Sequence, residues 1–273
     1  MSVPVSRSTI GRTLRYDHAL DRPSAVEVPV EMPVNIAYGN LPYAVMMATP
    51  DDLDDFVAGF SLTEGIVTGL DEIRGVKVDE QADGFVVTVD LVADALSRHL
   101  TRRRSLSGRT SCGLCGVESL DQVPGASRAV APAEPVAPRA IERALASLDD
   151  HQPLHRLTRA VHAAAFCDPE GTILMAREDV GRHNALDKLI GACLRAGVQP
   201  GQGFIVITSR CSFEMIEKAA IFGVGTLVAI SAPTSLAIDR AHALGIALVA
   251  VARRDTAVAF TQSPSFQPKA IAS

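Results

Sequence analysis

The sequence predicts an α/β protein, α+β overall, in which a smaller strand-rich N-terminal domain precedes a C-terminal domain with a mainly parallel sheet. Two observations predict this class. Before residue 122 apolar and polar residues alternate in short stretches, whereas after residue 160 short apolar runs alternate with segments of helix length. The segment 123–138 separates the two patterns, and its four prolines are typical of a connector.

The composition is that of an ordinary globular chain. Hydrophobic residues make up 47% of the 273 residues and charged residues 21%. The net charge of −5 argues against indiscriminate binding to nucleic acid. No apolar run is long enough to cross a bilayer, and residues 1–20 lack the apolar core of a signal peptide. We therefore expect no membrane contact and a cytoplasmic location.

The N-terminal elements follow from local patterns. Residues 1–25 mix charged and apolar side chains without a period and are interpreted as an irregular arm. The N-terminal domain, 26–122, begins with two strands predicted within 26–48, which turn at Gly39 and Asn40.

A helix is predicted after these strands. Thr49 is placed as its cap and Pro50 at its first position, and the aspartates that follow favour the positive end of a helix dipole. A second hairpin is predicted over 75–91. The segment 96–116 is rich in Arg, Ser and Gly and is interpreted as a loop.

The C-terminal domain, 139–262, precedes a short tail, 263–273. A short helix is predicted over 139–150, and each later helix ends near a glycine that can serve as its C-cap. Strands are predicted over 160–167, 172–177, 203–208, 226–231 and 246–251, and helices over 184–197, 212–223 and 235–245.

Polar side chains gather in the loops that follow four of these strands. The carboxyl ends of strands form the binding edge of an open α/β sheet, and three of these loops also precede a helix N-terminus, where unpaired N–H groups favour an anion. Because guanidinium groups suit phosphate, we expect this edge to bind a phosphorylated, nucleotide-like ligand. The simpler alternative is that these loops are polar because they are exposed and cap helices. The residues concerned are Arg182, His183, Asn184, Ser209, Arg210, Ser231, Thr234, Ser235, Arg253 and Arg254.

Cys112 and Cys115 form a CxxC pair in the predicted loop. A structural zinc site needs further ligands, and a thioredoxin-like pair needs a strand-to-helix junction, neither of which the neighbouring sequence supplies. The other three cysteines are isolated and are interpreted as small buried hydrophobic residues. Arginines precede the pair and lower the pKa of a nearby thiol, which favours a nucleophile or a carrier of sulfur.

Four blocks of this sequence, in order, resemble the FdhD family of sulfurtransferase accessory proteins needed for active formate dehydrogenase. They are SGRTSCGLCGVESL, EDVGRHNALDKLIG, SRCSFEMIEKAAIFGV and SAPTSLAI. The resemblance runs from about residue 26 to residue 261. It implies a C-terminal domain similar in fold to the cytidine deaminases but without their zinc ligands, and it implies a homodimer.

The resemblance also implies an activity. A cysteine desulfurase would pass persulfide sulfur to this chain, which would pass it on to the molybdenum cofactor before formate dehydrogenase receives that cofactor. The cofactor, a bis(molybdopterin guanine dinucleotide), would be a bound substrate held partly through its guanine nucleotide moiety. No permanent metal is expected.

The family's site residues carry over by position. Cys112 matches the persulfide-bearing cysteine, and Cys115 matches its partner. Arg253 is retained in the family's cofactor-contacting segment, whereas Thr256 replaces that segment's second arginine. The segment corresponds to Val251, Ala252, Arg253, Arg254, Asp255 and Thr256.

Two alternatives belong to other classes of protein. One is a chaperone that binds the molybdenum cofactor and hands it on without catalysis. The other is a nucleotide-binding regulator stabilised by zinc at Cys112 and Cys115. Persulfide on the purified protein would favour the sulfurtransferase, and stoichiometric zinc would favour the regulator.

Overall fold

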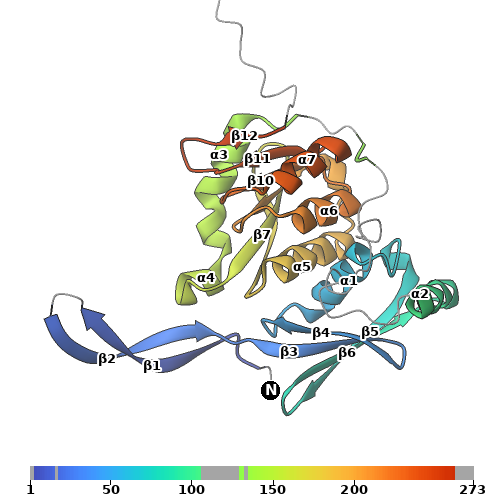
Figure 1. The fold of residues 1–273 in the computed structure, drawn as a ribbon, viewed down its shortest axis with the longest axis horizontal. Helices are drawn as coiled ribbons and strands as arrows, with labels where there is room; N and C mark the ends of the chain where they lie inside the picture. The colour runs from blue at the N-terminus through green and yellow to red at the C-terminus, as the bar shows by residue number, and fades with distance from the viewer. Residues whose placement is uncertain (1–2, 16–17, 106–128, 132–134, 262–273) are drawn as a thin grey trace, which may run out of the picture.

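The computed structural model describes residues 3–15, 18–105, 129–131 and 135–261. Within these ranges the strands form three sheets of two, four and six strands (Figure 1). The six-stranded sheet and its helices make up the C-terminal part, and the other two sheets precede it in the chain.

The first sheet is a ribbon of β1 (Ser6–Arg15) and β2 (His18–Pro29), which pair antiparallel. Figure 1 shows the ribbon extending away from the rest of the molecule. The prediction of an irregular arm over 1–25 was therefore wrong. A largely exposed ribbon does not need alternating apolar and polar residues, and Ile10 is 73% exposed. The signal that marks a half-buried strand is missing for this reason.

The four-stranded sheet has the order β4-β3-β6-β5 and carries the N-terminal core. The first hairpin turns at Gly39 and Asn40 as predicted, and Gly39 has a φ of 59°, which glycine adopts without strain. The second hairpin is also confirmed. The strands are β3 (Met32–Tyr38), β4 (Leu41–Ala48), β5 (Ile73–Gln81) and β6 (Gly84–Leu91).

Helix α1 (Leu53–Thr63) covers this sheet but begins later than predicted. Pro50 lies before the helix, and Thr49 does not cap it. Instead, the Thr49 hydroxyl accepts a hydrogen bond from the Val180 N–H (3.2 Å), and the Thr49 N–H donates to Asp179 (3.0 Å). The expected capping residue therefore binds the C-terminal part of the chain.

Helix α2 (Ala93–Ser105) corrects the interpretation of 96–116 as a loop, as far as residue 105. Ala95 and His99 lie one turn apart and are buried, and the His99 ring is 5.0 Å from the Tyr38 ring between centroids. The rest of the helix is mostly polar, so its buried stripe is too short to produce a helical period.

The six-stranded sheet has the order β12-β11-β10-β9-β7-β8 and is mixed. β9, β10 and β11 are parallel, whereas β7 is antiparallel to both β8 and β9, and β12 is antiparallel to β11. The prediction of a mainly parallel sheet was wrong, because the short turn 168–172 joins β7 to β8 and such a turn joins only antiparallel strands. The strands are β7 (His162–Cys167), β8 (Ile173–Asp179), β9 (Phe204–Ile207), β10 (Thr226–Ala229), β11 (Ala247–Ala250) and β12 (Val258–Ala259), the last of which was not predicted.

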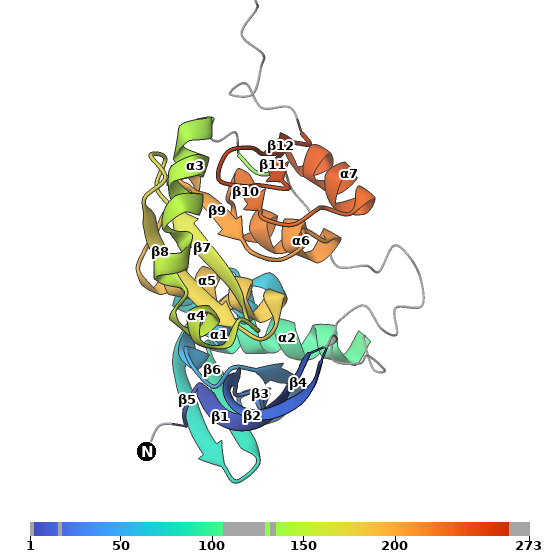
Figure 2. The same cartoon turned by 90° about the vertical axis from the view of Figure 1, so that its left-hand side faces the viewer.

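Helices cover both faces of this sheet (Figure 2). On one face Ile141 and Ala144 of α3 join a core cluster with Val206 and Val228 of the sheet. On the other face α5, α6 and α7 pack, and these are the helices predicted over 184–197, 212–223 and 235–245. The helices are α3 (Pro138–Ser147), α4 (Pro153–Thr158), α5 (Arg182–Arg195), α6 (Phe213–Phe222) and α7 (Ser235–Leu244), with short 3₁₀ helices over Leu70–Glu72, Leu148–His151 and Pro200–Gln202.

Helices α1 and α5 join the two parts of the chain at two glycines. A Cβ atom on Gly59 would lie 1.9 Å from the Asp187 carbonyl oxygen, and one on Gly191 would lie 1.8 Å from the Asp55 carbonyl oxygen. The helices therefore pack backbone against backbone. One cluster of buried apolar side chains runs through this contact from the four-stranded sheet to the six-stranded sheet.

Most of the predicted connector, 123–138, lies outside the described residues, as do residues 106–122. The division into domains 26–122 and 139–262 therefore stays a prediction. The likeness of the second domain to cytidine deaminases stays one as well.

Candidate functional site

Strands β8, β9, β10 and β11 run in the same direction, because β8 and β9 are both antiparallel to β7, and β9 to β11 are parallel. Their carboxyl ends lie at one edge of the sheet, which we call the carboxyl edge. The topology brings all four polar loops of the sequence to this edge.

Arg182 and His183 form the start of α5 at the carboxyl edge. Arg182 Nε and His183 Nε2 are buried, and neither has a hydrogen-bond partner among the described residues. Burial lowers the pKa of His183 to about 4, helped by the positive charges of Arg182 and Lys218. The imidazole is therefore neutral at pH 7. Buried polar groups of this kind call for a partner, which is either an ordered water molecule or a ligand.

Asn184 follows them but has a different place. Its Nδ2 donates to the Met47 carbonyl (2.8 Å) and to Asp179 Oδ1 (3.0 Å), and its side chain is buried. The amide hydrogens of Asn184 therefore join α5 to β4 of the N-terminal part.

The loop after β9 holds Ser209 and Arg210. The buried Ser209 hydroxyl donates to the Arg210 carbonyl (3.0 Å), and the Arg210 side chain is exposed. Glu214, in the first turn of α6, was not predicted. The pKa of Glu214 is lowered from its ordinary value. Burial alone would raise it, but local hydrogen bonds and the positive charge of Arg182 outweigh burial. The electrostatic interaction of Glu214 with His183 and Arg182 indicates that the starts of α5 and α6 converge.

The loops after β10 and β11 are tied together. The Ser231 carbonyl accepts a hydrogen bond from the Val251 N–H (3.2 Å), and Arg253 Nη1 donates to the Ile230 carbonyl (2.5 Å). Val251 has a φ of 52°, which is strained for a β-branched residue and is held by these contacts. The sequence-predicted segment thus forms an ordered corner of the carboxyl edge.

Residues 253–256 form a tight turn in this corner, in which the Arg253 N–H donates to the Thr256 carbonyl (2.7 Å). Ala252 is buried beneath it, whereas Arg254 is exposed and lies 4.0 Å from Asp149 between charged atoms. Asp255 and Thr256 are also exposed.

A pocket of about 290 Å³ lies between this turn and helix α3. It combines apolar walls with charges of both signs. Arg139 and Glu142 of α3 were not predicted, because α3 is far in the sequence from β11 and the turn after it, and nothing in its pattern marks it as part of a site. The lining residues are Pro138, Arg139, Ile141, Glu142, Val249, Arg253, Arg254, Asp255, Thr256, Ala257 and Ala259.

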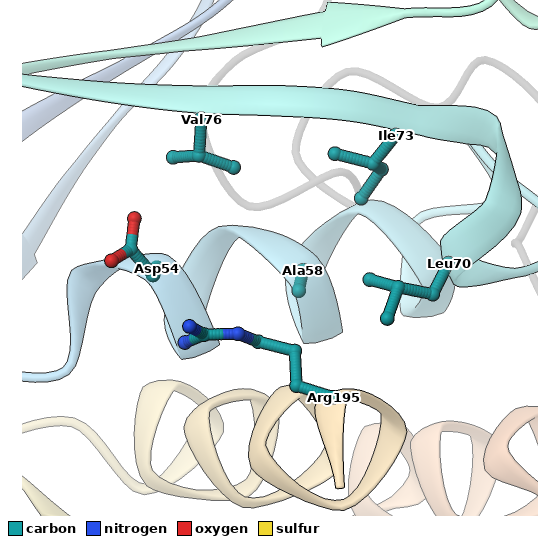
Figure 3. A pocket seen from close by; sticks show the side chains of 6 residues that line it. All are labelled: Asp54, Ala58, Leu70, Ile73, Val76 and Arg195. Atoms are coloured by element: carbon teal, nitrogen blue, oxygen red, sulfur yellow. The ribbon is translucent and has the colours of Figure 1, made fainter. Parts of the chain in front are cut away.

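A second hollow, of about 390 Å³, lies between α1, β5 and α5 (Figure 3). Its two charged side chains are Asp54 and Arg195, and the other lining residues are Ala58, Leu70, Ile73 and Val76. Arg195 Nη1 already donates to Asp55 (2.6 Å). None of the sequence-predicted site residues lines this hollow.

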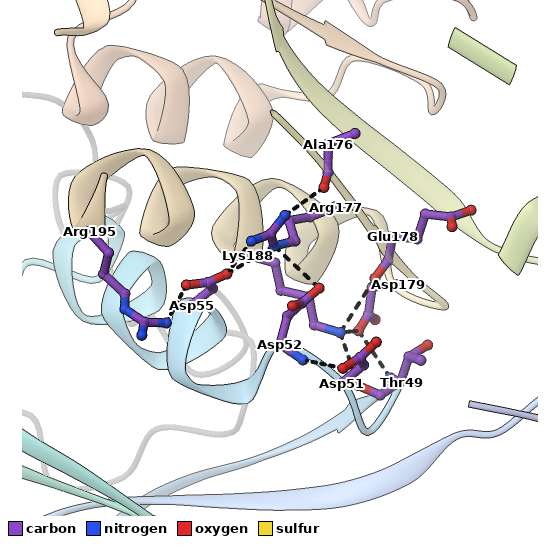
Figure 4. Close-up of polar contacts among 10 residues, drawn as sticks. All are labelled: Thr49, Asp51, Asp52, Asp55, Ala176, Arg177, Glu178, Asp179, Lys188 and Arg195. Carbon is purple, nitrogen blue, oxygen red and sulfur yellow. Dashed lines mark hydrogen bonds and ion pairs between the residues drawn. The ribbon is translucent and has the colours of Figure 1, made fainter. Parts of the chain in front are cut away.

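Buried ion pairs hold the carboxyl edge against the N-terminal part (Figure 4). Lys188 and Asp179 are fully buried and 2.7 Å apart, and Lys188 Nζ also donates to the Thr49 carbonyl (3.0 Å). Asp179 accepts in addition from the Gly181 N–H (2.8 Å). Asp179 is the last residue of β8 and Gly181 precedes α5, so this network fixes the loop that carries Arg182.

A second network contains Asp187, the residue before Lys188 in α5. Lys218 Nζ lies 2.8 Å from Asp187 Oδ2 and donates to the Thr63 hydroxyl (2.9 Å). The Thr63 hydroxyl in turn donates to Asp187 (2.8 Å). Helices α1, α5 and α6 are thereby joined by polar contacts as well as by their apolar faces.

Three cysteines lie within the described residues, and all are buried and free: Cys167, Cys193 and Cys211. Burial raises the pKa of each of these thiols to about 12, so they are not nucleophiles at pH 7. Their interpretation as small buried residues is confirmed. Cys112 and Cys115 lie outside the described residues. In the part of the chain that the structure covers, no group of three or more His, Cys, Asp or Glu side chains is placed to hold a metal ion.

Comparison with known proteins gives the family. A family model described as the FdhD/NarQ family matches residues 29–266. The chain belongs to this family. Its match begins within the last residues of β2 and includes both larger sheets.

Relatives within the FdhD/NarQ family align over nearly their whole length. The sulfur carrier protein FdhD of Agrobacterium fabrum is 48% identical over 243 residues, 86% of this chain and 88% of that protein. The sulfur carrier protein FdhD of Xanthomonas campestris is 45% identical over 262 residues, 95% of this chain and 93% of that protein. The protein of that name from Bordetella petrii is 45% identical over 234 residues, 86% of this chain and 84% of that protein.

A solved structure supports the fold. The crystal structure of a formate dehydrogenase accessory protein from Desulfotalea psychrophila matches with a TM-score of 0.75 at 23% identity, over 97% of this chain and all of that one. Among the described helices, none has the length and apolar character to span a membrane.

Proposed function

We propose that this chain is a sulfur carrier that serves the maturation of formate dehydrogenase. The observation that carries this proposal is the identity of 45% to 48% with proteins named sulfur carrier protein FdhD, over at least 84% of each chain. The membership in the FdhD/NarQ family supports it.

The sulfur would be carried by Cys112. The three thiols inside the folded core have pKa values near 12 and no access to a partner, which leaves the CxxC pair as the candidate. Cys112 as thiolate attacks the outer sulfur of a desulfurase persulfide, so that a new S–S bond forms on Cys112 and the desulfurase cysteine leaves as thiolate. Cys115 is the partner thiol of the same CxxC pair. By this reaction the chain acts as a sulfurtransferase.

The recipient would be the molybdenum cofactor, a bis(molybdopterin guanine dinucleotide), held as substrate at the carboxyl edge. The polar groups present suit such a ligand. Arg182 Nε and His183 Nε2 are buried and have no hydrogen-bond partner among the described residues, and Arg253 and Arg254 flank a pocket. Arg254 supplies a guanidinium next to Thr256, where the family has its second arginine.

The desulfurase, formate dehydrogenase and a second copy of this chain are the proposed partners, in the cytoplasm. The test uses Cys112→Ser and Cys115→Ser in the full chain. After incubation with a cysteine desulfurase and cysteine, mass spectrometry of the peptide holding both residues should show one added sulfur atom in wild type and none in Cys112→Ser.

The same variants are then tested for restoring formate dehydrogenase activity in cells that lack this protein. Cys112→Ser should restore little of the wild-type activity, because the carrier is covalent and the buried thiols of Cys167, Cys193 and Cys211 cannot replace it. Normal restoration by this variant would refute the carrier role and leave a chaperone without catalysis. Stoichiometric zinc in the purified protein would instead favour the zinc-stabilised regulator.

A further inference from the structure

The pocket between α3 and the turn 253–256 has a feature that phosphate binding alone does not explain: a carboxylate on a fixed helix. Helix α3 is anchored to the sheet by Ile141 and Ala144, which are 4% and 0% exposed. Glu142 follows Ile141 directly and lines the pocket. In the part of the chain that the structure describes, no hydrogen bond or ion pair ties its carboxylate to another side chain.

The other lining residues divide into two kinds. Val249, Ala257, Ala259 and Ile141 present apolar surface, which suits the faces of an aromatic ring. Arginines surround this surface and suit the phosphates that follow a nucleoside. They are Arg139, Arg253 and Arg254.

We propose that Glu142 recognises the guanine base of the bound cofactor. Guanine presents two N–H donors side by side, on N1 and on the 2-amino group, and a carboxylate has two oxygens that can accept both at once. Adenine does not present this pair, and hypoxanthine has only the N1 donor. A carboxylate acceptor at this position therefore selects guanine among the purines. This inference rests on the proposed function for the presence of such a ligand.

The size of the pocket agrees with one end of the cofactor. Its volume of about 290 Å³ is at the lower limit of small-molecule sites, so it holds a base and not a whole dinucleotide. Arg253 reaches from the turn to the end of β10 by its bond to the Ile230 carbonyl. The phosphates of the bound ligand would therefore extend from the pocket along the carboxyl edge toward β10.

The pterin of the same cofactor carries the same pair of donors on its pyrimidine ring. The arginines around the pocket favour guanine, since the phosphates of a guanine nucleotide lie close to its base. A pterin without phosphate is included in the test to distinguish recognition of the guanine base from recognition of the pterin ring.

A control variant removes a carboxylate that lies outside the pocket. Glu80→Gln removes an exposed carboxylate from β5 in the N-terminal part and controls for net charge.

The experiment measures binding of GDP, IDP, ADP and 6-hydroxymethylpterin to the full chain by isothermal titration calorimetry. Wild type should bind GDP about tenfold more tightly than IDP or ADP. A hydrogen bond to a charged group contributes about 1.5–3 kcal/mol, and the lower end, roughly 10-fold, applies because Glu142 is exposed. Glu142→Gln should lose this preference while keeping its affinity for ADP. Glu80→Gln should retain it.

Three results would overturn the inference: a wild type without a preference for GDP, a Glu142→Gln variant that keeps the preference, or a Glu142→Gln variant that loses only pterin binding. Circular dichroism of each variant confirms that it is folded. None of these results affects the persulfide on Cys112, so the failure of this inference and the failure of the sulfur-carrier role are observed separately.

Discussion

The buried pair of Lys188 and Asp179 provides a quantitative test of the structure. Both side chains are 0% exposed and their charged atoms are 2.7 Å apart. Lys188→Met removes the ammonium group but keeps a side chain of similar length. The variant leaves the Asp179 carboxylate buried without a cation, and it leaves the Thr49 carbonyl, 3.0 Å from Lys188 Nζ, without that donor.

Breaking such a pair on one side costs about 3–5 kcal/mol of unfolding free energy. Asp179 keeps three N–H donors, from Thr49, Gly181 and Asn184, which compensate part of its charge. We therefore expect a loss of about 3 kcal/mol, at the lower end of this range. Urea unfolding at pH 7, followed by circular dichroism, measures it.

Two variants make the test specific. The double variant Lys188→Met and Asp179→Asn removes the buried charge altogether and should recover at least about 1 kcal/mol of the loss. Arg195→Ala breaks a pair whose arginine side chain is 49% exposed and should cost no more than about 1 kcal/mol. A Lys188→Met variant within 1 kcal/mol of wild type would show that Lys188 and Asp179 are not both charged and buried as described.

Two further predictions concern titration and thiol reactivity. The pKa of His183 is about 4 in the folded protein against 6.5 for a free histidine, so the unfolded chain binds a proton first and stability falls as the pH drops from 6.5 toward 4. Between pH 7 and pH 5, wild type should therefore lose up to about 2 kcal/mol more unfolding free energy than His183→Gln, as measured by urea unfolding. Equal losses in the two proteins would contradict the lowered pKa of His183. Cys167, Cys193 and Cys211 should stay unlabelled by a thiol reagent at pH 8 until denaturant is added, because burial raises their pKa values to about 12. Rapid labelling of any of the three in the native protein, located by peptide mapping, would contradict that burial.

Much of the C-terminal part follows from the sequence, because its elements are buried on a regular period. The strand of 203–208 is a short apolar run, and the helix of 212–223 ends at Gly223, which adopts a left-handed φ of 97°. The direction of β7 was missed because periodicity identifies a strand but not its partner. Its antiparallel pairing depends on the turn 168–172, whose Asp168 carboxylate accepts a hydrogen bond from the Thr172 N–H (2.7 Å).

The candidate site was predictable only in part, for a related reason. Arg182 and His183 follow a strand and start a helix, so sequence order alone brings them to the carboxyl edge. Glu142 lines its pocket because α3 packs next to β11 and the turn after it, although both are far from α3 in the sequence. Such a contact depends on the tertiary packing, and no local pattern reports it. The capping signal at Thr49 failed for the same reason, since its hydroxyl binds Val180.

The contact of α1 and α5 at Gly59 and Gly191 has a mechanical consequence. With main chains this close, neither helix can slide or roll against the other without steric overlap, so the halves of the molecule behave as one rigid block. The carboxyl edge is then a preformed surface whose shape is set before any ligand arrives. A ligand that binds at this edge would therefore not incur the entropic cost of closing two halves around it.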